Sequence, residues 1–475
     1  MAVEFLAKAL WRSRFVSAAA LVASVAACEV GPDYKRPAAE APPAYKESQG
    51  WKIGEPQQAG SDKAWWSIYN DAPLDELEKQ IDISNQNLKS SEAAYRQAVA
   101  LVGEARANFF PTLTLGASVL RAQQQSHVQT LYAGSVGASW EIDIWGRIRR
   151  EVESTSANAQ ASAADLAAAR LSAQTALATD YFDLRVEDEL KRLLDATVVA
   201  FTRSLQITQN KYDAGVAAET DVASARTQLE STRAQAINVG VLRSQLEHAI
   251  AVLTGKPPAD FTLAPAPVVV ADVPVTPPGL PSGLLERRPD IAAAERQMAA
   301  ANAQIGVAVA AYYPTISLSG SYGLASTALS ALFSPESVVW AVGPQLAATL
   351  YEGGLRSAQV EAARATYDQT VALYRQTVLT AFQQVEDQLA ALRILEQQAV
   401  VQDDAVEAAA EAERLTLNQY EAGTVDYTSV ITAQANALSS RQTALGILQS
   451  RITASVALVT ALGGGWDVNQ LPPNP

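Results

Sequence analysis

The feature that most constrains this chain is a pair of long segments that lack both glycine and proline. Residues 147–214 and 355–422 each run 68 residues without either one, although the chain of 475 residues holds 25 Gly and 22 Pro. Glycine and proline are the residues that most strongly interrupt a helix. Each segment therefore predicts one very long helix, about 100 Å in length at 1.5 Å per residue. A compact enzyme domain has no use for such a rod, so we expect one elongated unit.

The composition excludes several kinds of site. The formal net charge is -14, so nucleic acid, which needs a basic face to neutralise its phosphates, is not an expected partner. A single cysteine excludes a disulfide framework and a Cys-based zinc cluster. His127 and His248 stand alone, without metal-ligand spacing. We therefore expect no metal, no cofactor and no catalytic residues.

One short motif could be mistaken for a nucleotide site. Gly255-Lys256 resembles the end of a phosphate-binding loop, but Ile250 occupies the position of its first glycine. Pro257 replaces the serine or threonine that would follow the lysine. The motif therefore predicts the end of a helix and not a phosphate site.

The N-terminus predicts an export signal. A basic stretch that ends at Arg14 precedes an apolar stretch, residues 15–27, which is too short to span a bilayer comfortably. Residues 1–27 are therefore expected to be a signal peptide. The only cysteine follows at the cleavage position, in Val25-Ala26-Ala27-Cys28.

This cleavage sequence resembles the lipobox of bacterial lipoproteins. The resemblance implies that Cys28 is the lipid attachment site, and that Glu29 after it directs the protein to the outer membrane. A lipid chain anchors a protein to a membrane without spanning it. Ordinary cleavage without lipidation is the alternative.

Proline-rich segments divide the rest of the chain. Residues 28–60 predict an extended, lipidated N-terminal tether, and residues 256–282 predict a linker, because neither segment can hold a long helix. Two structural repeats are expected on either side of that linker, at 61–255 and 283–466. Residues 467–475 form a C-terminal tail.

The two repeats are copies of one unit. Ten residues between Asn210 and Ala236 recur 208 residues later without a gap, and Gly255 meets Gly463 at the same spacing. Upstream, Phe109-Phe110-Pro111-Thr112 returns as Tyr312-Tyr313-Pro314-Thr315, 203 residues later. An aromatic pair before Pro-Thr and a Tyr-x-Ala-Gly turn in the same order indicate a true duplication.

The register through the middle of the long helices stays open at this point. Val186-Glu187-Asp188 resembles Val385-Glu386-Asp387 at a spacing of 199 residues, which disagrees with the other matches. We therefore pair no residues across the centres of the long helices from sequence alone.

Each repeat is predicted to contain, in order, a helix, two strands, a long helix, a turn and a second helix. In the strand segments, about residues 111–145 and 314–350, apolar residues alternate with polar or small ones, as Ile316, Leu318 and Tyr322 do. Strands of about ten residues with one apolar and one polar face suit a transmembrane barrel, with lipid outside and water inside. An antiparallel sheet on a soluble core is the alternative.

The number of strands has a consequence for assembly. Four strands cannot close a barrel, because about eight are needed and open edges are not tolerated in lipid. Two copies of the chain would supply eight strands and three copies twelve. A lumen wide enough for solutes favours three copies.

The long helices predict helix packing of the coiled-coil type. In the second one, Val378, Phe382, Val385, Leu389 and Leu392 follow a heptad spacing. A plain coiled-coil stalk without a pore is the alternative. The return of each long helix as a second helix, after Gly215 or Gly423, and the strands in the same chain argue against a stalk.

Several motifs together resemble one family, the TolC-like outer-membrane efflux proteins, and in particular its lipidated OprM and NodT type that serves resistance-nodulation-division (RND) pumps. These motifs are Gly31-Pro32-Asp33-Tyr34, Trp65-Trp66, Phe110-Pro111, Trp145-Gly146-Arg147-Ile148-Arg149, Leu284-Leu285-Glu286-Arg287-Arg288-Pro289-Asp290-Ile291 and Ala461-Leu462-Gly463-Gly464-Gly465-Trp466.

The resemblance implies an α+β membrane protein with a duplicated helix-strand-strand-long helix-helix unit. As a homotrimer it would form a 12-stranded outer-membrane β-barrel and a 12-helix periplasmic α-barrel. It would be a passive, gated conduit that exports drugs or other small molecules, anchored by lipid in the outer membrane. Its partners would be a periplasmic membrane-fusion adaptor and an inner-membrane RND transporter. The exit duct of a type I protein secretion system is the alternative function.

The resemblance also points to residues at the far ends of the long helices. Tyr212, Gly215, Tyr420 and Gly423 correspond to the helix tips that contact the adaptor, and each glycine is expected to supply a left-handed turn. Capping the helices is an equally simple role for the tyrosines.

The entrance is expected just beyond the tips. Glu219, Asp221, Asp426 and Tyr427 lie there, and three copies of each acid would form acidic rings that favour cations. Solvated surface charges are the alternative.

The chain departs from the family pattern in the same region. Well-known relatives carry an arginine soon after the second tip glycine and an aspartate about nine residues past it, where this chain has Val425 and Thr432. We therefore expect an entrance that is looser or built from other contacts.

Overall fold

The computed structural model describes residues 29–38, 41–47, 64–124, 127–266, 273–274 and 281–473. The expected signal peptide and its cleavage site, residues 1–27, and the expected lipid attachment at Cys28 lie outside these residues. Parts of the expected tether and linker lie outside them as well.

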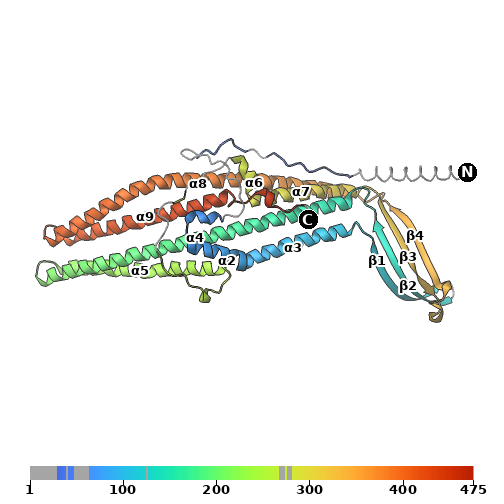
Figure 1. The fold of residues 1–475 in the computed structure, drawn as a ribbon, viewed down its shortest axis with the longest axis horizontal. Coiled ribbons are helices and arrows are strands. Elements are labelled where there is room, and N and C mark those ends of the chain that lie inside the picture. The colour runs from blue at the N-terminus through green and yellow to red at the C-terminus, as the bar shows by residue number, and fades with distance from the viewer. Residues whose placement is uncertain are drawn as a thin grey trace.

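The chain folds as the duplicated unit that the sequence predicts (Figure 1). The first half contains α2 (Ala72–Ser84), α3 (Gln86–Ala107), β1 (Thr112–Gln124), β2 (His127–Glu141), α4 (Arg147–Asp213) and α5 (Glu219–Leu253). The second half contains α6 (Leu284–Arg287), α7 (Pro289–Ala310), β3 (Thr315–Ser326), β4 (Val338–Ala347), α8 (Leu355–Glu421) and α9 (Tyr427–Ala461). Short 3-10 helices connect these elements at Trp65–Tyr69, Pro258–Asp260, Pro281–Gly283, Leu329–Ala331, Pro335–Ser337 and Val468–Gln470.

The helix lengths settle the register between the halves. The long helices α4 and α8 have 67 residues each, the return helices α5 and α9 have 35, and α3 and α7 have 22. The bounds of the long and return helices match at a spacing of 208 residues throughout. The match at a spacing of 199 is therefore accidental. The true counterpart of Val385 is Leu177, and both side chains are fully buried.

Both long helices begin at a glycine that follows a strand. Gly146 and Gly354 have φ of 80° and 90°, a conformation that residues with a Cβ resist. Carboxylates then satisfy the first free N–H groups. Asp143 accepts from the backbone of Ile148 and Arg149 at 3.2 and 3.0 Å, and Glu352 accepts from the backbone of Arg356 at 3.2 Å.

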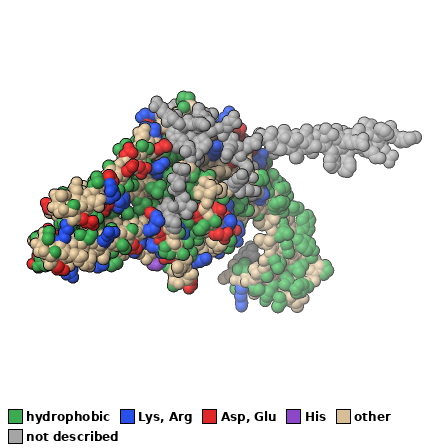
Figure 2. Space-filling model, turned by 60° about the vertical axis from the view of Figure 1, so that its left-hand side comes forward, with side chains coloured by type: hydrophobic (Ala, Val, Ile, Leu, Met, Phe, Trp, Pro, Cys, Tyr) green, Lys and Arg blue, Asp and Glu red, His purple; other side chains and the backbone are tan. Residues whose placement is uncertain are grey.

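The four strands form one antiparallel sheet in the order β1-β2-β3-β4. Its register places Leu115, Val136, Tyr322 and Trp340 in one row across all four strands. The adjacent row lies on the opposite face and holds only small or polar residues: Thr114, Gly137, Ser321 and Ala341. Hydrophobic side chains gather over the strands (Figure 2). The sheet is a single layer, and no helix or strand of the described residues covers its apolar face (Figure 1).

The helices run side by side away from the sheet (Figure 1). Between α4 and α8 lie α7, on the side of the sheet, and α9, on the side of the helix tips. On the other side of α4 lie α3 and α5. The chain therefore presents four columns of helix in the order α8, α7 with α9, α4, and α3 with α5.

The core lies where short and long helices meet, midway along the rods. One cluster joins Trp65, Leu74 and Ile81 to Tyr181 of α4 and Val456 of α9. A second cluster contains the whole heptad stripe of α8. That stripe packs on residues of both α7 and α9. It therefore does not pair with a single helix as in a two-stranded coiled coil.

A buried carboxyl group in this region makes stability depend on pH. Glu78 of α2 is fully buried, and both carboxylate oxygens lack a hydrogen-bond partner among the described residues. Burial, with Asp82 and Asp75 nearby, raises the pKa of Glu78 to about 9. The folded protein therefore holds this group protonated at neutral pH, whereas the unfolded chain releases the proton above its ordinary pKa. This group makes the protein less stable as pH rises from about 4.5 toward 9.

We predict that Glu78→Gln stabilises the protein against unfolding, by about 2 kcal/mol or more at pH 8 and by much less at pH 5, because glutamine needs no proton to enter the core. Denaturant titrations at the two pH values measure the difference. Glu76→Gln, at an exposed position on the same helix, serves as the control and should change stability at neither pH. An equal gain from Glu78→Gln at both values would contradict this account.

Candidate functional site: the helix tips and the N-terminal strap

The tip turns of both hairpins have the same backbone. Gly215 and Gly423 adopt φ of 75° and 80°, which confirms the expected left-handed turn. Each long helix closes with paired backbone bonds: Gly215 and Val216 donate to the carbonyls of Tyr212 and Lys211, both at 2.8 Å. Gly423 and Thr424 donate to Tyr420 and Gln419 at 3.0 and 2.9 Å.

The two tips differ in what surrounds their tyrosines. Tyr420 and Tyr427 are 5% and 2% exposed, with their ring centroids 5.2 Å apart. Tyr212, the counterpart of Tyr420 in the first repeat, is 41% exposed. The sequence places the two tip tyrosines in equivalent positions, but the chain buries only the second one.

Polar contacts from α4 hold the second tip in place. The ammonium of Lys211 lies 4.3 Å from the centroid of the Tyr420 ring and also donates to the Tyr420 carbonyl oxygen. The Tyr427 hydroxyl lies 3.2 Å from Ser204 Oγ, and the Tyr420 hydroxyl donates to Thr208 Oγ1 at 3.4 Å. These five residues, Ser204, Thr208, Lys211, Tyr420 and Tyr427, form what we call the inner seam. It joins the two repeats of one chain at their tips.

The acidic residues at the entrance occupy the first turns of the return helices. Asp426 caps α9 by accepting from Ser429 N at 3.0 Å and Ser429 Oγ at 2.7 Å, and these bonds lower the pKa of its carboxyl group. Asp221 accepts from Ala218 N at 3.3 Å, and Glu219 is exposed. All three carboxylates therefore lie near the positive end of a helix dipole.

Tyr427 differs from its expected position at the entrance. Its ring is buried inside the chain, and that burial raises the pKa of its hydroxyl. The side chain packs on Tyr420 because α4 lies directly beside the start of α9, so in this conformation it does not face the entrance.

The positions of the missing family latch are Val425 and Thr432. Val425 packs, partly buried, beside Tyr420, and Thr432 donates only to a carbonyl of its own helix, at 2.9 Å. The polar and aromatic contacts between the two tips come instead from the residues of the inner seam.

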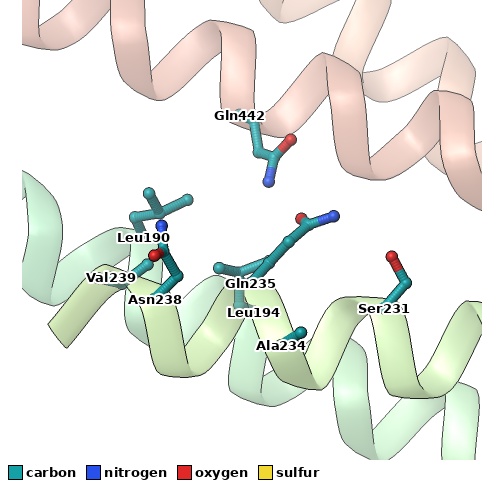
Figure 3. Close-up of a pocket in the computed structure, with 8 residues that line it drawn as sticks. All are labelled: Leu190, Leu194, Ser231, Ala234, Gln235, Asn238, Val239 and Gln442. Atoms are coloured by element: carbon teal, nitrogen blue, oxygen red, sulfur yellow. The ribbon is translucent and has the colours of Figure 1, made fainter. Parts of the chain in front are cut away.

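Two openings lie between the hairpins. One, at the tips, has a volume of about 430 Å³ and is lined by Ile207, Asn210, Lys211, Ala214, Val216, Glu421, Ala422 and Gly423. The other, about 560 Å³, lies midway between the α4/α5 pair and α9, and its eight lining residues are drawn in Figure 3. None of those eight titrates. Across the described residues, no group of His, Cys, Asp or Glu side chains could hold a metal ion.

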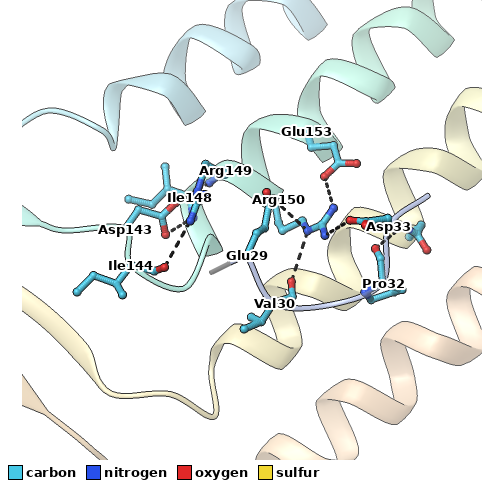
Figure 4. Close-up of polar contacts among 11 residues, drawn as sticks. Glu29, Val30, Pro32, Asp33, Asp143, Ile144, Ile148, Arg149, Arg150 and Glu153 are labelled. Atoms are coloured by element: carbon cyan, nitrogen blue, oxygen red, sulfur yellow. Dashed lines mark hydrogen bonds and ion pairs between the residues drawn. The ribbon is translucent and has the colours of Figure 1, made fainter. Parts of the chain in front are cut away.

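At the opposite end of the helices, an N-terminal strap, residues 29–38 and 41–47, crosses both repeats. Arg150 of α4 is the centre of its attachment (Figure 4). The buried guanidinium, 4% exposed, contacts Glu29 at 3.1 Å, Asp33 at 2.9 Å and Glu153 at 2.7 Å. It also donates to the carbonyl oxygen of Val30 at 3.4 Å.

The strap then continues onto the second repeat. Asn302 of α7 donates to the Pro32 carbonyl at 3.0 Å, and Arg36 donates to the Leu285 carbonyl at 3.2 Å. Further along, the backbone N–H groups of Lys46 and Glu47 donate to the Glu386 carboxylate of α8 at 2.7 and 3.0 Å. The strap therefore fixes the position next to Cys28 at the level where strands and helices meet.

Comparison with known proteins decides the family. The profile of the outer membrane efflux protein family matches residues 77–256 and 280–464, which is most of the chain and includes both repeats. The chain belongs to the outer membrane efflux protein family.

Individual family members resemble it over nearly their whole length. The probable efflux pump outer membrane protein TtgC of Pseudomonas putida is 31% identical over 455 residues, which cover 92% of this chain and 93% of TtgC. The solvent efflux pump outer membrane protein SrpC of Pseudomonas putida is 33% identical over 469 residues, covering 93% and 96%. The structure of the outer-membrane channel OprN matches with a TM-score of 0.86 and 30% identity, covering 92% of this chain and all of that one.

Family membership fixes the class of function. The chain is the outer-membrane channel component of an efflux system, with a periplasmic extension, and it is a conduit and not an enzyme. The sequence resemblance to TolC-like efflux proteins is thereby confirmed.

Sequence reasoning missed the partners of the tip tyrosines and the role of Arg150. Ser204, Thr208 and Lys211 lie more than 200 residues from the tyrosines that they contact. A signal for Lys211 was present in the duplication, because its counterpart 208 residues later is Gln419 and not a cation. No comparable signal marks the contacts of Arg150 with Glu29 and Asp33, which lie on a segment without regular secondary structure.

We predict that Arg150→Met releases the strap and lowers stability by about 2–4 kcal/mol, because three carboxylates lose a buried partner. Limited trypsin cleavage after Lys35, together with a denaturant titration, measures both effects. Arg170→Met removes a surface pair with Asp82 and should leave the strap protected. Unchanged cleavage and stability in the Arg150 variant would contradict the assignment.

We predict that Lys211→Gln weakens the inner seam and speeds hydrogen exchange of residues 427–438 of α9 about three- to tenfold, since a partly buried cation-π contact contributes about 1 kcal/mol. Lys191→Gln makes the same change on α4 at an exposed pair with Asp195 and should leave that exchange unchanged. If residues 427–438 exchange in both variants as they do in the parent, Lys211 does not hold the tip.

Proposed function

We propose that this chain forms a homotrimeric, gated and passive conduit that exports drugs or other small molecules across the periplasm and the outer membrane. A periplasmic membrane-fusion adaptor and an inner-membrane RND transporter would complete the system, and the transporter would supply the energy. The observation that carries this proposal is the single-layer sheet with one apolar face and two unpaired edges, from which the long helices continue.

The sheet supports a shared barrel. Among the described strands, β1 and β4 each pair on one side only, so the backbone groups on their other sides need partners. Lipid offers none, and the apolar row of Leu115, Val136, Tyr322 and Trp340 favours lipid contact. Pairing of β1 with β4 of another copy satisfies both edges, and three copies close twelve strands.

The helices support the same number of copies. Large exposed hydrophobic residues are concentrated on the outermost helices of the chain, α5 and α8, whereas α9 has none. On α5 they are Ile237, Val241, Leu242 and Val252, and on α8 they include Leu373, Leu379, Ile394, Val400 and Val401. A second copy laid beside the first covers both faces. Four columns of helix per chain then give a tube of twelve in the trimer.

We further propose the division of the chain that the sequence suggests. Repeats at 61–255 and 283–466 are supported by the two blocks of the family match, at 77–256 and 280–464. Lipidation of Cys28 is supported by the attachment of Glu29 to Arg150, which holds the neighbouring residue close to the strands that would enter the membrane.

Tyr212, Gly215 and Gly423 remain our proposed adaptor contact, since they are exposed at the far end of the rods from the sheet. Tyr420, the fourth residue expected there, is buried in the inner seam and would act by positioning the turn at Gly423.

Susceptibility of a deletion strain to drugs tests the function. We expect greater susceptibility and an unchanged profile of secreted proteins. Loss of one secreted protein with unchanged drug susceptibility would favour a type I protein secretion duct instead.

We predict that the entrance prefers cations, because Glu219, Asp221 and Asp426 would each form a ring of three carboxylates. Replacing all three by alanine should shift the reversal potential in a salt gradient toward zero and change the conductance of purified channels in planar bilayers. Asp213→Ala and Glu421→Ala, on the preceding long helices, test whether any acid near the tip has the same effect. Conductance and selectivity that stay the same in the triple variant would exclude the acidic rings.

A further inference from the structure

The two hairpin tips are equivalent in sequence but not in packing. Tyr420 and Tyr427 are buried because α4 lies beside them, whereas their counterparts 208 residues earlier, Tyr212 and Glu219, are exposed. The hairpin of α4 and α5 forms one edge of the described structure, and no other described helix of the same copy covers the outer side of its tip (Figure 1).

A second copy of this chain is the occupant that the duplication supplies. Within the chain, α9 packs against α4. Because α5 is the counterpart of α9 and α8 the counterpart of α4, the same packing repeated between copies places α5 against α8 of a neighbour. The exposed hydrophobic residues on α5 and α8 fit that arrangement. This step rests on the proposed trimer.

The same spacing identifies the residues of this second contact. Tyr212 and Glu219 of one copy would face Ala412, Thr416 and Gln419 of the next, in place of the residues of the inner seam. We call these five residues the outer seam.

The outer seam lacks the interactions that hold the inner one. Gln419 stands in place of Lys211, which removes the cation over the tyrosine ring. Ala412 stands in place of Ser204, which removes the hydroxyl that meets Tyr427.

The outer seam also lacks the ring pair of the inner seam. Glu219 stands in place of Tyr427, so Tyr212 has no aromatic neighbour there. Its carboxylate favours water over a packed seam. Arg414, on this part of α8, is already paired with Glu411 at 2.6 Å. The outer seam therefore has neither the cation-π contact nor the ring pair.

We infer that the periplasmic entrance alternates three firm inner seams with three weak outer seams, and that it opens at the outer ones. In this opening, the α4/α5 tip of each copy separates from α8 of its neighbour while each chain keeps its own two tips joined. The residues that determine where the entrance opens are two of the pairs in which the repeats differ, Lys211 with Gln419 and Tyr427 with Glu219.

Hydrogen exchange of the purified, detergent-solubilised complex tests this inference without relying on transport. Residues 219–230 of α5 and 427–438 of α9 are equivalent peptides, so the packing of their seams decides their relative rates. We expect exchange about tenfold faster in the α5 peptide of the parent, since weakly packed segments open more often.

A double variant, Glu219→Tyr with Gln419→Lys, gives the outer seam the residues of the inner one. We expect it to slow exchange of residues 219–230 to within about threefold of residues 427–438, and to lower the open probability in planar bilayers. Glu219→Gln is the matched control, because it removes the charge without adding a ring, and its α5 peptide should still exchange fast.

Equal exchange of the two peptides in the parent, or no slowing in the double variant, would overturn the inference. The mass of the same sample separates this failure from that of the proposed function. A complex that does not contain three copies contradicts the proposed trimer, whereas three copies with equal exchange contradict only the assignment of the opening seam.

Discussion

Backbone hydrogen bonding at the two edges of a four-stranded sheet determines how the rest of this molecule can be used. Within the described residues, β1 and β4 each leave one row of N–H and C=O groups without strand partners, and the apolar row through Leu115 and Trp340 suits one face of the sheet to lipid. In lipid, each unsatisfied group costs several kcal/mol. The chain therefore needs other copies of itself, and because α4 and α8 continue from the strands through Gly146 and Gly354, closure of the barrel also brings the helices into a ring.

The duplication makes this ring nearly regular, and the differences between the repeats make it uneven. The helices of the two repeats have equal lengths at a constant spacing of 208 residues, so each chain has two equivalent hairpins, α4/α5 and α8/α9. Lys211 and Tyr427 join the two hairpins of one chain, while Gln419 and Glu219 occupy the equivalent positions at its edges. A few residue differences between the two tips thus distinguish the inner seam, which holds one chain together, from the outer seam, which can open.

Local patterns in the sequence were sufficient to predict the elements and their order. The segments free of Gly and Pro gave both long helices to within one residue, and alternation located all four strands. Positive φ at Gly215 and Gly423 followed from the turn that their position requires. The partners of Tyr420, Tyr427 and Arg150 did not follow, because contacts across more than 100 residues leave no trace in local periodicity. The misleading match at Val186 shows the same limit, since common helix residues coincide by chance.

The central claim is that three copies share one barrel and one tube. Electron cryo-microscopy of the complex in a lipid nanodisc tests it most directly. The account predicts three chains around one axis, with β1 of each paired to β4 of its neighbour and α5 packed on the neighbouring α8. A particle of one or two copies, or one in which the edges of β1 and β4 remain unpaired in the lipid, would contradict it.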